Sequence, residues 1–106
     1  MLIANKEKVV GLLVEYTLME GMADAQVEAL QSFVAGLKDI GDEGYSYTAF
    51  ETNDPTKFIG LLEFDDDAAK QRFIESAPFA AYRDGAKDRF AAPPNATPIR
   101  RVATTR

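Results

Sequence analysis

The chain contains no His and no Cys, so the side chains left for acid–base or anion-stabilising chemistry are mainly Tyr, Arg, Asp and Glu. Four of them lie in or beside apolar segments and form the candidate catalytic set: Tyr16, Tyr82, Arg83 and Glu63. A phenol hydroxyl or a guanidinium can donate a hydrogen bond to a developing oxyanion, and a carboxylate among apolar side chains can act as a general base. The sequence therefore favours chemistry that needs proton transfer and anion stabilisation.

Each of these residues also has a structural interpretation, which the sequence leaves open. The tyrosines can be core packing, and Arg83 can be an exposed helix charge. Glu63, a lone acid in an apolar strand, can pair with Arg100 or Arg101 on a neighbouring or partner strand. Residues 83–106 hold six of the 12 basic residues, which predicts pairing with acidic surface elsewhere, or alternatively an anion site near these arginines.

The missing residue types exclude several kinds of site. Without His or Cys there is no usual zinc site, iron–sulfur cluster, disulfide or axial His or Cys haem ligand. The acidic run Asp65–Asp67 precedes a predicted helix and is interpreted as capping rather than metal binding, which would need further oxygen ligands. We therefore expect no metal and no cofactor. A net charge of −5 speaks against nonspecific nucleic-acid binding.

The spacing of apolar residues predicts the elements that position these groups. Predicted strands are Val9–Leu18, Gly44–Thr52, Lys57–Phe64 and Pro98–Thr104, and predicted helices are Ala23–Leu37, Ala68–Glu75 and Phe79–Phe90. Ala91–Pro98 is expected to be a connector, and Pro98 places the last strand at a sheet edge. The order β-α-β-β-α-β, with its second helix broken at Pro78, predicts one α+β domain over residues 1–106. Its ferredoxin-like split arrangement has a four-stranded antiparallel sheet with both helices on one face.

The other face of that sheet is predicted to be apolar as well. Leu13, Ile59 and Leu61 would form an exposed apolar patch in a single copy. We therefore expect a homodimer that packs sheet against sheet. The longest apolar run near the N-terminus, Val9–Val14, is too short to span a membrane, so we expect a cytoplasmic protein with no membrane partner.

Several local patterns, in this order, resemble the antibiotic biosynthesis monooxygenase family, a branch of the dimeric α/β-barrel superfamily. The matching segments are Glu20-Gly21, Gly44-Tyr45-Ser46-Tyr47, Pro55, Glu63-Phe64 and Ala69–Phe79. The resemblance covers nearly the whole chain and depends on the order and spacing of these segments. It implies a dimeric α/β barrel.

The chain also departs from the family pattern. The family's usual His falls on Phe73, and the aromatic residue that follows the strand Glu, commonly Trp, falls on Phe64. The Asn, Trp and His of the haem-degrading branch fall on Val14, Phe73 and Arg83, so haem degradation is not expected here.

The resemblance implies oxidation of a small aromatic, quinol or polyketide-type substrate without cofactor or metal. The expected pocket lies between sheet and helices and is lined by Val14, Phe33, Tyr47, Phe50, Phe64, Phe73 and Phe79. Two alternatives stay open. One is a non-catalytic homodimer that binds a small apolar ligand or stabilises a partner, and the other is an isomerase or lyase with Glu63 as base.

Overall fold

The computed structural model describes residues 10–105. Its elements are β1 (Val10–Thr17), α1 (Ala23–Ile40), β2 (Tyr45–Glu51), β3 (Lys57–Phe64), α2 (Asp67–Ile74), α3 (Ala77–Asp84), the short 3₁₀ helix η2 (Ala86–Asp88) and β4 (Asn95–Arg100). The expected β-α-β-β-α-β order is confirmed, with the second helical region divided into α2 and α3. The start of the predicted first strand, Val9, lies outside the described residues.

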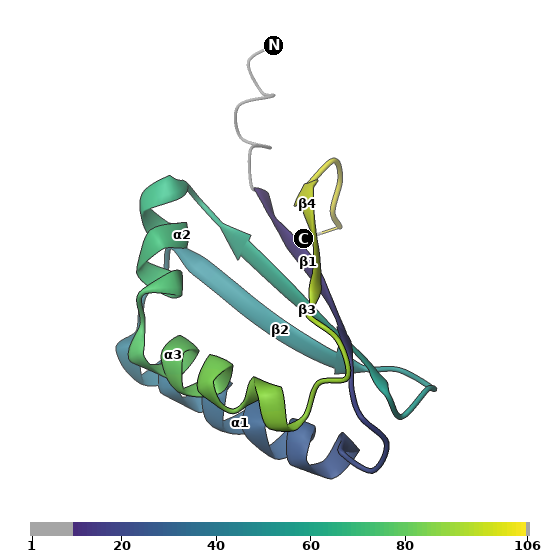
Figure 1. The fold of residues 1–106 in the computed structure, drawn as a ribbon. Helices are drawn as coiled ribbons and strands as arrows, with labels where there is room; N and C mark the ends of the chain where they lie inside the picture. Colours follow the sequence, from purple (N-terminus) through teal and green to yellow (C-terminus); the bar gives the residue numbers. More distant parts are fainter. Residues whose placement is uncertain (1–9, 106) are drawn as a thin grey trace.

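The four strands form one antiparallel sheet in the order β2-β3-β1-β4, with the helices on one side of it (Figure 1). β1 lies inside the sheet and pairs with β3 and β4, which are both far from it along the chain. β4 is an edge strand, which agrees with the position of Pro98. The predicted ferredoxin-like split fold is thus the fold of this chain.

Alternation along the strands gives the sheet two distinct faces. The inner face, which contacts the helices, carries buried Tyr16, Phe58, Leu62 and Phe64. Packed on it are the helix residues Leu30, Phe33, Leu37, Ala69, Phe73 and Tyr82. The outer face, on the side away from the helices, carries the half-buried Leu13, Ile59, Leu61 and Ile99 and the exposed Phe50.

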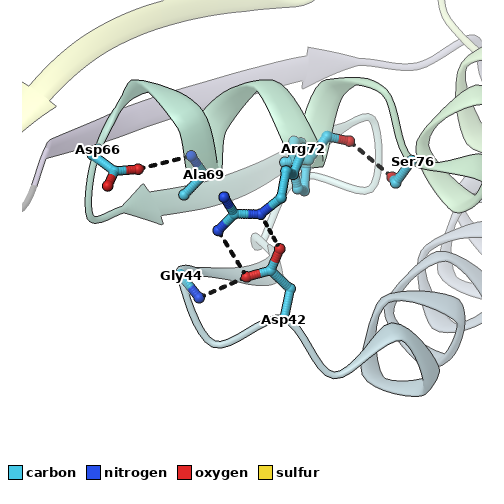
Figure 2. A network of polar contacts seen from close by, with 7 residues as sticks. Asp42, Gly44, Asp66, Ala69, Arg72 and Ser76 are labelled. Carbon is cyan, nitrogen blue, oxygen red and sulfur yellow. Dashed lines mark hydrogen bonds and ion pairs between the residues drawn. The ribbon is translucent and has the colours of Figure 1, made fainter.

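α2 is fixed at both ends by side-chain hydrogen bonds (Figure 2). Asp66 caps its N-terminus by accepting from the Ala69 N–H at 2.8 Å, which confirms the capping interpretation of the acidic run. Arg72, in its last turn, forms a bidentate ion pair with Asp42 in the loop that follows α1. The ion pair ties α2 to the start of β2.

The first helix extends three residues beyond its predicted end, to Ile40, and two other predicted elements are wrong at both ends. The last strand begins at Asn95 and ends at Arg100, so half of the expected connector pairs with β1. The predicted helix Phe79–Phe90 begins earlier, because Ser76 caps it and Pro78 occupies its first turn, and it ends at Asp84. Among the described residues, no helix is long and apolar enough to cross a membrane.

Candidate functional site

A pocket of about 320 Å³ lies between the inner face of the sheet and the second helical region. Its lining comes from all four strands, from α1, α2, α3 and η2, and from the segment between η2 and β4: Leu12, Val14, Tyr16, Phe33, Tyr47, Leu62, Phe73, Ile74, Phe79, Tyr82, Arg83, Ala86, Phe90, Pro94 and Ala96. The surface facing the cavity is apolar. The volume lies at the lower end of the range for small-molecule pockets and fits a small aromatic ligand.

Three tyrosines from three elements meet in this lining: Tyr16 of β1, Tyr47 of β2 and Tyr82 of α3. The Tyr47 side chain passes over Gly60 of β3, where any Cβ would collide with its hydroxyl, and so reaches Tyr16. The Tyr16 and Tyr47 hydroxyl oxygens are 2.9 Å apart. We call Tyr16, Tyr47 and Tyr82 the tyrosine cluster.

A buried amide connects the tyrosine cluster to an arginine. The Gln26 Nε2 donates to the Tyr82 hydroxyl at 2.8 Å, and the Gln26 Oε1 accepts from the Arg89 Nε at 2.8 Å. The Arg89 guanidinium also lies over the Tyr82 ring, 5.2 Å from its centroid. A positive charge therefore stands two hydrogen bonds away from the Tyr82 hydroxyl.

Burial raises the pKa of all three phenols. The pKa of Tyr16 is raised furthest, because the neighbouring Tyr47 and Tyr82 add to the effect of burial. Burial raises the pKa of Tyr47 to about 12, although its hydrogen bond with Tyr16 opposes the rise. Burial also raises the pKa of Tyr82, but hydrogen bonds and the Arg89 charge oppose it. At neutral pH the tyrosine cluster is uncharged and serves as a set of hydrogen-bonding groups, not as a base.

Arg83 stands at the rim of the pocket. Its side chain is exposed, and its guanidinium lies 5.4 Å from the centroid of the Phe79 ring. A cation held over an aromatic wall can attract an anionic ligand to the opening.

Eight of the predicted site residues line the same pocket: Val14, Tyr16, Phe33, Tyr47, Phe73, Phe79, Tyr82 and Arg83. Phe50 is not brought to it, because this side chain lies on the outer face and is 48% exposed. Phe64 is buried in the core beneath Lys70 and does not line the pocket. Both placements depart from the prediction.

Glu63 lies on the outer face, away from the pocket lining. Its carboxylate accepts a hydrogen bond from Arg101 at 3.0 Å, so its predicted salt bridge is confirmed. A base at the pocket would have to face it, and Glu63 does not.

Sequence reasoning missed Gln26 and Arg89. Gln26 lies three residues after Ala23 and four before Leu30, so it occupies the apolar stripe of α1, and this position was a signal that its amide is buried. Arg89 lies 63 residues from Gln26, and no local pattern connects the two.

A second, larger hollow of about 520 Å³ runs between α1 and β2, lined in part by Val34, Lys38 and Phe50. It is a more open groove, and of the tyrosine cluster only Tyr47 lines it. The less open pocket, which all three tyrosines line, is therefore the better candidate site. Within residues 10–105 no group of three His, Cys, Asp or Glu side chains is placed to hold a metal ion.

No protein-family model matches the chain, and no curated protein matches it. Solved structures do match. A protein of unknown function from Nitrosomonas europaea has a TM-score of 0.80 at 21% identity, covering 93% of this chain and 94% of the other. A candidate antibiotic biosynthesis monooxygenase from the same organism has a TM-score of 0.79 at 18% identity, covering 89% and 90%.

A candidate antibiotic biosynthesis monooxygenase from Caulobacter crescentus has a TM-score of 0.80 at 13% identity, covering 92% of each chain. At these identities the likeness concerns the fold. The expected antibiotic biosynthesis monooxygenase fold is confirmed over nearly the whole chain.

Proposed function

We propose that this chain is a monooxygenase of the antibiotic biosynthesis type that oxidises a small aromatic or quinol substrate without a cofactor. The observation that carries the proposal is an apolar pocket of about 320 Å³ with hydrogen-bonded phenols in its lining. The fold shared with candidate monooxygenases supports it.

In this proposal the substrate supplies the electrons. A methylene of an anthrone-type substrate becomes a carbonyl: one oxygen atom of O₂ enters that carbonyl, the other leaves as water, and the two C–H bonds provide four electrons. The substrate loses its first C–H proton to bulk solvent as it enters, and the protein then excludes water and stabilises the enolate that reacts with O₂. Tyr16 and Tyr82 are the proposed hydrogen-bond donors to the enolate oxygen, and Arg83 is its proposed counter-charge at the rim.

Oxygen uptake tests this proposal. A panel of a benzohydroquinone, a naphthohydroquinone and anthrone should include a compound that drives uptake above a buffer blank. Tyr82→Phe, Tyr16→Phe and Arg83→Ala should each lower that rate about tenfold or more. Tyr45→Phe removes a phenol hydroxyl and Lys87→Ala removes a cation, both outside the pocket lining, and each should leave the rate unchanged. A panel without uptake above the blank would reject the oxygenase for these substrates.

A second candidate function is non-catalytic binding of a small aromatic ligand. It is favoured by a specific observation: the phenols in the tyrosine cluster already have hydrogen-bond partners, and the cavity surface is apolar. Ligand-observed NMR with naphthalene and naphthol separates the two functions. Binding of these ligands, together with no oxygen uptake for any compound of the substrate panel, supports this second function.

A homodimer is part of the proposal. The outer face presents Leu13, Ile59, Leu61, Ile99 and Phe50, a set too apolar for a sheet surface in water. A second copy packed on this face would remove it from water and leave the pocket, which lies on the inner side, open to ligands.

A further inference from the structure

Gln26 is the most deeply buried large side chain among the described residues, with no exposed surface at all. It lies in the first turns of α1, behind the pocket lining and not in it. Its amide has one partner at each end, Arg89 at the oxygen and Tyr82 at the nitrogen. A buried amide costs free energy unless both ends are paired, so these two contacts are what allow a glutamine here.

The chemistry of Arg89 fixes which way this amide points. A guanidinium has donors only, so the atom of Gln26 that faces Arg89 must be the carbonyl oxygen. The Nε2 group then faces Tyr82 and can only donate. The Tyr82 oxygen is therefore the acceptor in this hydrogen bond, and its own O–H cannot point back to Gln26.

Other contacts hold Arg89 in place. Its Nη1 donates to the Gly85 carbonyl at 3.0 Å, and its guanidinium lies over the rings of Tyr82 and Phe90. Within the described residues, Arg89 forms no ion pair with a carboxylate. Its charge is therefore free to polarise the Gln26 amide and, through it, the Tyr82 hydroxyl.

We propose that Gln26 and Arg89 are positioning residues that turn the Tyr82 O–H away from Gln26, so that it is a donor within the tyrosine cluster, behind the apolar surface of the pocket. The pocket then selects rings that carry an acceptor or anionic oxygen, such as a phenolate, an enolate or a quinone carbonyl. A ligand oxygen that reaches the tyrosine cluster replaces one of its internal hydrogen bonds. The inference rests on the proposed function of this same pocket and names the ligand class.

The probe for this inference is 4-nitrophenol, a single-ring phenol whose ionised form absorbs visible light. Titration of the bound probe gives its apparent pKa in the pocket of the wild-type protein and of variants. Loss of a donor to the bound phenolate should lower its proton dissociation constant about tenfold in Tyr82→Phe. Gln26→Met should act in the same direction, and Gln26→Glu more strongly, because a carboxylate accepts the Tyr82 proton.

Two further variants keep the test decisive if Gln26 variants fold poorly. Arg89→Met releases the carbonyl end of Gln26, so the amide can turn and accept from Tyr82, and the bound probe should become a weaker acid. Arg89→Lys keeps a donor-only cation and should restore most of the wild-type value. Gln31→Met makes the same change at an exposed position of α1 and is the matched control. Thermal unfolding of every variant identifies those that are folded.

The inference is overturned if Tyr82→Phe shifts the bound probe while folded Gln26→Met and Arg89→Met variants leave it at the wild-type value. It is also overturned if the wild-type protein does not bind 4-nitrophenol. A shifted probe without oxygen uptake for any panel substrate would support the positioning role and reject the oxygenase, so the two failures are distinguishable.

Discussion

Three phenol hydroxyls share the enclosed space between the sheet and the helices, and each has a hydrogen-bond partner. Tyr16 and Tyr47 bond to each other, whereas Tyr82 is bonded to Gln26. Burial, more than this pairing, makes ionisation of any one of the three phenols costly. At the scale of single residues, this burial has consequences for stability.

The first of these is a loss of stability in alkali. Unfolded tyrosine ionises near pH 10, but folded Tyr47 has a pKa of about 12. Unfolding therefore releases a proton between these values, so the contribution is fully present below pH 10 and is lost as pH rises toward 12. About 2–3 kcal/mol of unfolding free energy should disappear. Urea unfolding across this range should show a shallower loss for Tyr47→Phe than for wild type; equal losses would contradict it.

Gly60→Ala should weaken the tyrosine cluster without touching it directly. The new Cβ would collide with the Tyr47 hydroxyl and displace it from Tyr16. The expected cost is about 1 kcal/mol of unfolding free energy. A double-mutant cycle with Tyr47→Phe measures the coupling, since the cost should shrink when no hydroxyl is present. Additive effects of the two changes would show that Gly60 has no role in this contact.

The sequence predicted most of the pocket wall because its aromatic residues follow the apolar periodicity of their own elements. It could not predict that Phe64 is core and Phe50 is outside, since both lie in alternating strands where either face can be occupied. Gln26 and Arg89 needed the tertiary structure, because their contact joins the start of α1 to the segment after η2.

At the scale of elements, α2 depends on interactions at its ends. It has eight residues and buries only Ala69 and Phe73, so its own helix propensity contributes little stability. The Asp66 cap and the Asp42–Arg72 ion pair, drawn in Figure 2, hold the helix against the loop between α1 and β2. Phe73 is thereby fixed in the pocket wall.

Asp66→Ala should lower the free energy of unfolding by about 1 kcal/mol, because the Ala69 N–H loses its acceptor at the helix start. Asp65→Ala removes the same charge one residue earlier, where the side chain caps nothing, and is the matched control. Chemical denaturation followed by circular dichroism measures both. Equal stability of the two variants would contradict the capping role.

The element boundaries that the sequence missed have physical causes. Ala91–Pro98 contains three prolines and looks like a connector, but an edge strand tolerates proline because only one side of it must pair. Phe79, Tyr82 and Phe90 suggested one continuous helix, although Gly85 lies between them and α3 ends at Asp84. The apolar spacing continues past the end of α3 because Phe90 lines the same pocket as Phe79 and Tyr82.

At the scale of the whole molecule, the outer face predicts self-association. Sedimentation of the wild-type chain at micromolar concentration should give a dimer. Leu61→Glu places a charge at the centre of the outer face and should give monomers. Gln31→Glu introduces the same side chain on the exposed part of α1 and should remain dimeric. A stable, well-behaved wild-type monomer would reject the homodimer.

The place of β1 in the sheet bears on how the chain matures on the ribosome. β1 emerges before the other strands, yet both of its partners, β3 and β4, come later, and β4 contains the last pocket residue, Ala96. The local β2–β3 hairpin can form early, whereas the nascent β1 has no strand beside it until β3 has left the exit tunnel. A ligand can therefore stabilise only a finished polypeptide, and a fragment that stops before β4 should neither bind the ligand nor be protected by it from proteolysis.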